Sequence, residues 1–69
     1  MSVARITEIS ATSETGFEDA IQQGIERATN TLRNVQSAWI KEQRVTIADG
    51  RPTGYQVNMP ITFLLEDTL

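Results

Sequence analysis

Trp39 and Gln56 are the two side chains best suited to bind a planar ligand. Trp39 is the only tryptophan in the chain, and its ring can stack on a flat heterocycle. The amide of Gln56 offers such a ring both a hydrogen-bond donor and an acceptor. Each residue also has a purely structural interpretation. Trp39 can be a half-buried interface residue, and Gln56 can be a solvated residue of a strand. The ligand hypothesis therefore depends on whether both side chains lie on the same face of one sheet.

The composition argues against catalysis. The 69 residues include no histidine and no cysteine, which removes the commonest general base, the commonest transition-metal ligand and any thiolate metal site. The sequence has no phosphate loop, dinucleotide fingerprint or nucleophile motif with a partner base. We therefore expect that the protein is not an enzyme. An ion site stays open, because carboxylates from several copies could meet at a symmetry axis.

Length and charge indicate a small cytoplasmic protein that associates with itself. Residues 1–69 are long enough for a single domain, which as a monomer buries only roughly 60% of its unfolded surface. Disulfides cannot stabilise it, so oligomerisation is the usual remaining remedy. The net charge of −3 and the scattered basic residues argue against a nucleic-acid partner. No apolar run has the length of a signal peptide core or of a membrane span.

Residues 54–66 show the cleanest alternation in the chain and predict a strand. Its apolar face comprises Tyr55, Val57, Met59, Ile61, Phe63 and Leu65. Gln56 lies on the opposite, mixed face. Pro60 cannot donate a ladder hydrogen bond, which indicates either an edge strand or a bulge. An edge strand would invite pairing with another subunit.

Residues 17–33 predict an amphipathic helix that covers this apolar face. The apolar positions recur at steps of three and four residues and include Gly24. A glycine inside a helix costs roughly 1 kcal/mol relative to alanine, which suggests close approach to the sheet. Thr15 and Glu18 have the spacing of a capping box at the helix start. Asn34 is a possible cap at the other end.

Two further strands are expected, at residues 3–10 and 35–47. Within the second of these, alternation assigns Ala38, Ile40 and Glu42 to one face, with Ala38 and Ile40 in contact with the helix. Ser37 and Trp39 then point away from the helix, on the same side as Gln56. Asp49 and Gly50 form a strong turn signal, and residues 51–54 lengthen the connection to the last strand. We thus predict an α+β fold of strand, helix, strand and strand, in which a three-stranded antiparallel sheet packs on one helix.

The chain resembles the dodecin family over nearly its whole length. The resemblance rests on this element order, on Thr12 and Ser13 before the helix, and on residues 28–35, 55–59 and 63–67. Dodecins are small flavin-binding proteins that assemble as hollow dodecamers, so the resemblance implies a homododecamer. It further implies that riboflavin, FMN or FAD is stored or buffered at subunit interfaces, with Gln56 hydrogen-bonded to the isoalloxazine ring.

The stacking position of the family falls on Ser37 in this sequence, and Trp39 follows two residues later. A shift of two residues keeps the same strand face but moves the ring by about 6.6 Å. The candidate flavin-binding residues are therefore Trp39, Gln56 and Ser37. The alternative is a dodecin-like shell without flavin, which binds another small ligand or an ion, or serves as a structural assembly.

Overall fold

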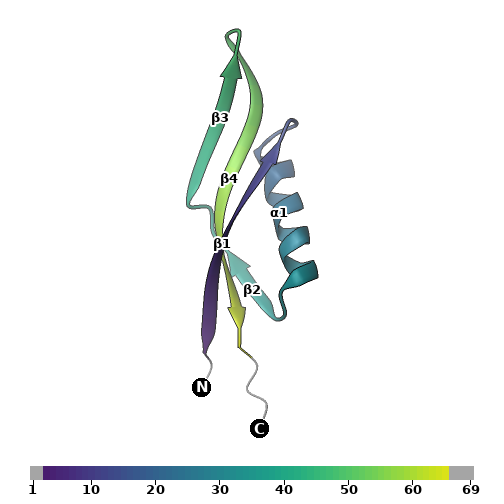
Figure 1. Ribbon diagram of the computed structural model, residues 1–69, viewed down its shortest axis with the longest axis vertical. Helices are drawn as coiled ribbons and strands as arrows, with labels where there is room; N and C mark the ends of the chain where they lie inside the picture. The colour runs from purple at the N-terminus through teal and green to yellow at the C-terminus, as the bar shows by residue number, and fades with distance from the viewer. Residues whose placement is uncertain (1–2, 66–69) are drawn as a thin grey trace.

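The computed structural model describes residues 3–65, and these form one helix packed on an antiparallel sheet (Figure 1). The elements are β1 (Ala4–Ser13), α1 (Phe17–Thr31), β2 (Val35–Ala38), β3 (Glu42–Ala48) and β4 (Arg51–Leu64). β4 is the central strand. It pairs with β1 on one side, and with β2 and then β3 on the other. The predicted α+β fold is confirmed; the sheet has four strands, because β2 and β3 follow one another along the same side of β4.

The core lies where α1 crosses the middle of β4. Val57, Met59 and Ile61 are fully buried, together with Ala20 and Ala28 of the helix. The predicted apolar face of the last strand is confirmed for these three positions, because alternate residues of a strand point to the same side. Leu65, at the end of that series, is exposed. The predicted strand end at residue 66 lies outside the described residues.

Gly24 lets the helix backbone approach the sheet, as its place in the apolar stripe predicts. A Cβ atom at this position would overlap with Met59 Cε and would lie 3.1 Å from Ala11 Cβ. Both approaches are closer than ordinary van der Waals contacts, and Met59 is fully buried. Any larger residue here would therefore require Met59 to move within the core.

We expect Gly24→Ala to lower the free energy of unfolding by about 1–2 kcal/mol. Overpacking a core costs typically about 1–3 kcal/mol, and the better helix propensity of alanine offsets part of this. Urea denaturation at fixed protein concentration measures the change. Gly54→Ala is the matched control, because a Cβ there would meet Thr46 only at ordinary van der Waals distances of 3.6 and 3.7 Å. Equal stability of the two variants would contradict the close-approach argument.

The expectation of one unbroken strand at residues 35–47 is wrong, because the segment is divided into β2 and β3 and its register already shifts between Val35 and Ser37. Ala38 lies opposite Ile61 and Glu42 opposite Asn58. The chain advances four residues from Ala38 to Glu42, whereas the opposed stretch of β4, from Ile61 to Asn58, spans three. One extra residue is therefore inserted before β3, as in a β-bulge. The insertion reverses the alternation beyond it. Glu42 consequently lies on the face away from the helix, whereas unbroken alternation assigned it to the face of Ala38. Ala38 packs on the core as predicted, but the core cluster does not include Ile40.

Pro60 explains the position of this break. Trp39 N–H donates to the Pro60 carbonyl oxygen at 3.2 Å, and Lys41 N–H donates to that of Asn58 at 2.8 Å. The N–H and C=O groups of one strand residue point to the same side of the strand. Because the Pro60 carbonyl faces Trp39, an N–H group at position 60 would face the same segment. Proline lacks this donor, and the ladder is irregular at Trp39–Lys41. The expectation of an edge strand is wrong, since β4 is central and Pro60 is buried. The bulge alternative is confirmed, although the extra residue belongs to the neighbouring strand.

The start of α1 is stabilised differently from the expected capping box. Gly16 is the N-cap residue and the helix has no side-chain cap. Instead, the Ser13 hydroxyl accepts hydrogen bonds from the backbone N–H groups of Thr15 (2.9 Å) and Gly16 (3.4 Å) and donates to Asp19 Oδ2 at 2.6 Å. The predicted Thr15–Glu18 box is thus wrong. At the other end, α1 stops at Thr31, and Asn34 adopts a left-handed conformation with φ 58° beyond the helix.

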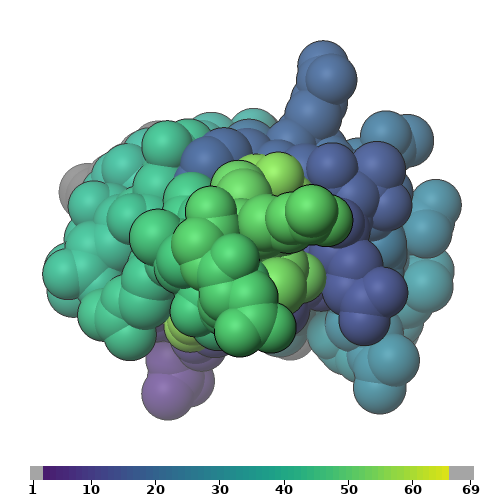
Figure 2. Space-filling model, turned by 90° about the horizontal axis from the view of Figure 1, so that it is seen from above, coloured from purple at the N-terminus to yellow at the C-terminus, as the bar shows by residue number. Residues whose placement is uncertain are grey.

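β3 and the first half of β4 form a hairpin that projects beyond the helix (Figure 1). Asp49 and Gly50 close it with positive φ angles of 53° and 74°, as expected for a tight hairpin turn. β4 begins at Arg51, so the longer connection over residues 51–54 is wrong. The molecule is correspondingly elongated, at 57 × 19 × 12 Å. Seen along its long axis, β3 and α1 lie on opposite sides (Figure 2).

Candidate functional site

The face of the sheet opposite the helix carries a group of polar side chains. We call it the uncovered face and define it by Glu8, Ser10, Glu42, Gln56 and Asn58. Ser10 lies opposite Asn58 on one side of β4, and Glu42 lies opposite Asn58 on the other. Directly opposed residues of an antiparallel pair share a face, so three strands contribute to one polar surface.

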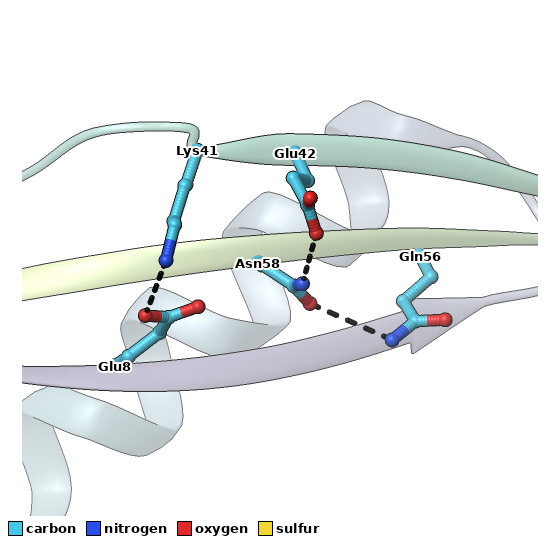
Figure 3. Close-up of polar contacts among 5 residues, drawn as sticks. All are labelled: Glu8, Lys41, Glu42, Gln56 and Asn58. Atoms are coloured by element: carbon cyan, nitrogen blue, oxygen red, sulfur yellow. Dashed lines mark hydrogen bonds and ion pairs between the residues drawn. The ribbon is translucent and has the colours of Figure 1, made fainter.

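Gln56 is held by its amide nitrogen. Gln56 Nε2 donates to Ser10 Oγ at 2.8 Å and to Asn58 Oδ1 at 3.5 Å. Its carbonyl oxygen points away from Asn58 (Figure 3), and within residues 3–65 it accepts no hydrogen bond. The side chain is half-buried. Gln56 therefore presents a hydrogen-bond acceptor at the surface.

Asn58 links Gln56 to a carboxylate. Asn58 Nδ2 donates to Glu42 Oε1 at 2.9 Å, within the usual range for such a bond. Beside it, Lys41 Nζ lies 3.3 Å from Glu8 Oε1 and bridges from the bulge to β1 across β4 (Figure 3). Both members of this ion pair are exposed, and such pairs typically contribute about 0–1 kcal/mol. The carboxylate of Glu42 is thus the charged end of the polar group around Gln56.

Trp39 follows Ala38 at the break in the second strand, and 49% of its surface is exposed. Its N–H bonds to Pro60, which gives it a register position on the uncovered face, as predicted. Pro60 is four residues from Gln56 along β4, a distance of about 13 Å. Among residues 3–65 of one chain, no contact joins Trp39 to Gln56.

Ser37 lies still farther from Gln56. It is opposite Thr62 and is exposed. It also lines a cavity of about 290 Å³ between α1 and β2, with Ile25, Val35 and Ile61 among the other lining residues. A larger, open groove of about 830 Å³ separates α1 from β1. Neither hollow includes Trp39 or Gln56. The three predicted site residues are thus not gathered into one pocket of a single chain.

Sequence reasoning missed Ser10 and Asn58 as partners of Gln56, and it missed Glu42 as the partner of Asn58. Asn58 was on the expected face, two residues from Gln56, and this spacing is the only local signal. Ser10 is 46 residues away from Gln56 in the sequence, so their contact depends on strand register. Glu42 reaches this face only because of the bulge.

Neither a metal cluster nor a membrane span is found in the described part of the chain. Within residues 3–65, no group of three or more acidic residues is close enough to hold an ion. The only helix there, α1, is too short and too polar to cross a bilayer.

Comparisons with known proteins agree over almost the whole chain. The profile of the dodecin family matches residues 3–66. The dodecin of Thermus thermophilus is 41% identical over 66 residues, which are 96% of each chain. A crystal structure of a T. thermophilus protein superimposes with a TM-score of 0.90 at 40% identity and covers 99% of this chain and 100% of the other.

Two further structures extend the comparison. Streptomyces coelicolor dodecin gives a TM-score of 0.89 at 31% identity, with 97% and 96% of the two chains covered. A calcium dodecin from Mycobacterium tuberculosis, described as having a novel calcium-binding site, gives 0.80 at 23% identity, with 99% and 97% covered. This last likeness concerns the fold alone.

Proposed function

Because the chain belongs to the dodecin family, we propose that it assembles with itself, as a dodecamer, and binds flavin at its subunit interfaces. Its role would be to store or buffer riboflavin, FMN or FAD in the cytoplasm, without catalysis. The observation that carries this proposal is the outward carbonyl oxygen of Gln56 on the uncovered face, with the half-exposed ring of Trp39 on the same side.

The side chains fit the chemistry of an oxidised flavin. Its pyrimidine edge carries a ring N–H between two carbonyl groups, and the Gln56 oxygen can accept a hydrogen bond from that N–H. Trp39 offers an aromatic surface, and stacked rings contribute on the order of 1 kcal/mol beyond the area they bury. A bound flavin would supply a planar ring with a donor at its edge. In one chain, Trp39 bonds to Pro60, which is about 13 Å from Gln56 along β4, and this spacing favours a site composed of two copies.

A second candidate is a shell of the same fold that binds an ion or another small ligand. Ser37 favours it, because the family's stacking position lacks an aromatic ring in this chain. In addition, a protein of this fold from M. tuberculosis is described as a calcium dodecin. On the uncovered face, however, Glu8 is paired with Lys41 and Glu42 accepts from Asn58. To bind an ion, either carboxylate would have to give up its present contact.

The absorption spectrum of the purified protein, followed by flavin titration, separates the two candidates. We expect added riboflavin or FMN to quench the emission of Trp39 strongly, because stacked rings are in van der Waals contact. Calcium titrated into the same protein should leave the emission unchanged. Unaltered emission at saturating riboflavin, FMN and FAD would refute the flavin proposal, and tight calcium binding would favour the second candidate.

Trp39→Ala should weaken flavin binding about tenfold or more, since a loss of roughly 1.4 kcal/mol is one decade in affinity. It should leave assembly intact, because the buried core lies on the other face of the sheet. Isothermal titration and sedimentation velocity measure the two effects. If Trp39 is instead an interface residue, the variant will dissociate and flavin affinity will fall only with the loss of the assembly.

A further inference from the structure

Two hydrogen bonds connect a carboxylate to the candidate ligand-binding amide, and a third joins that amide to β1. Glu42 accepts from Asn58 at 2.9 Å, Asn58 accepts from Gln56 at 3.5 Å, and Gln56 also donates to Ser10 at 2.8 Å. The relay runs across β3, β4 and β1 (Figure 3). It joins residues that are exposed or half-buried in one chain.

The carboxylate determines the direction of this relay. An ionised carboxylate can only accept hydrogen bonds, whereas each amide has one donating and one accepting end. Glu42 therefore requires that Asn58 turn its NH₂ group toward it, which leaves Asn58 Oδ1 toward Gln56. Gln56 must in turn direct its NH₂ group toward Asn58 and its oxygen outward. Hydrogen bonds to an ionised acceptor are about twice as strong as neutral ones, so the charged end dominates the choice.

Both hydrogens of the Gln56 amide are used within the chain, one by Ser10 and one by Asn58. We propose that Glu42, acting through Asn58, is a positioning residue that makes Gln56 an acceptor only, so that the site selects planar ligands with a ring N–H donor. This inference rests on the proposed flavin-type function of the same face. It narrows the ligand class to rings with an imide-like edge.

Glu8 is the internal control for this argument. It lies on the same face and carries the same charge, but its carboxylate pairs with Lys41 at 3.3 Å and has no contact with Gln56 or Asn58. Glu8→Gln removes one negative charge from the same face, as Glu42→Gln does. Only Glu42 sets the direction of the amides.

The test compares riboflavin with 3-methylriboflavin, in which a methyl group replaces the hydrogen of the ring N–H and so removes the donor. For the wild type, we expect riboflavin to bind about tenfold or more tightly, because the analogue leaves the Gln56 oxygen without a donor. Glu42→Gln can donate to Asn58 and so permits the reversed relay, in which Gln56 turns its NH₂ group outward. An outward NH₂ group can donate to a ring carbonyl of either ligand. We therefore expect the ratio of riboflavin affinity to analogue affinity to fall to within about threefold of unity in Glu42→Gln. The Glu8→Gln variant should keep the wild-type ratio.

The possible outcomes separate this inference from the proposed function. Failure of the wild type to bind riboflavin would overturn both. Binding of riboflavin and its analogue with equal affinity would overturn the inference and leave flavin binding intact, and this measurement needs no variant. Retention of the full ratio in Glu42→Gln, or its loss in Glu8→Gln, would show that Glu42 does not position Gln56. Circular dichroism and sedimentation of each variant confirm that the compared proteins are folded and assembled alike.

Discussion

Met59→Ala is expected to lower the free energy of unfolding by about 2–5 kcal/mol, the range found when a large buried aliphatic side chain is truncated to alanine. Met59 has no exposed surface and lies in the middle of the central strand. Its Cε atom occupies the space directly beneath Gly24 of the helix. Truncation thus leaves a cavity where the helix backbone comes nearest to the sheet. For a domain of this size, such a loss is a large fraction of the total stability.

Urea denaturation at one fixed protein concentration measures this effect, since association changes apparent stability. Val3→Ala is the control, because it also deletes apolar atoms but at a position that is 61% exposed. Surface substitutions of this kind usually change stability by less than about 0.5 kcal/mol. A cost for Met59→Ala no larger than that for Val3→Ala would show that the core is not centred on Met59.

Ile47→Asp is expected to dissociate the proposed homo-oligomer. Ile47 is 67% exposed in one chain, and Val45 on the same strand is also exposed. They belong to a hairpin that extends beyond the helix, and an isolated two-stranded hairpin is marginally stable in water. Burial of one isoleucine side chain stabilises by roughly 1.5–3 kcal/mol, and this contribution recurs at every equivalent contact of a symmetric assembly. An aspartate at the same place must lose its hydration without a partner.

Native mass spectrometry and sedimentation velocity at micromolar concentration report the mass of each protein. Gln22→Glu adds the same charge on the exposed side of α1 and should leave the mass unchanged. A monomeric wild type would refute self-assembly altogether. An Ile47→Asp variant with the wild-type mass would show that the hairpin tip lies outside the subunit contacts.

Local patterns determined much of the fold. Alternation of apolar residues over 55–63 marked the last strand and the face that it buries, because strand side chains alternate with a period of two. The spacing of apolar residues from Phe17 onward marked the helix, and Gly24 within that spacing indicated the close approach that the structure contains. Asp49 and Gly50 identified the hairpin, since few other residue pairs adopt two positive φ angles.

Tertiary structure decided where Pro60 lies and what it does. Within its own strand, proline indicated an edge or a bulge, and the sequence offered no means to choose. The sheet places β4 in the centre, so the missing donor faces another segment, and the irregularity appears at Trp39–Lys41 instead. Residues 35–47 contain no proline or glycine, and so no local signal marked the break in the second strand.

The candidate site, too, was determined partly by the sequence and partly by the tertiary structure. Amide and aromatic chemistry together with strand alternation singled out Gln56 and Trp39 and put them on the face away from the helix. Only strand register could bring Ser10 and Asn58 together, and only the inserted residue could turn Glu42 to the same side. Side-chain chemistry and local periodicity are properties of the sequence itself. The direction in which Gln56 presents its amide depends on contacts across three strands, and these exist only after the sheet has formed.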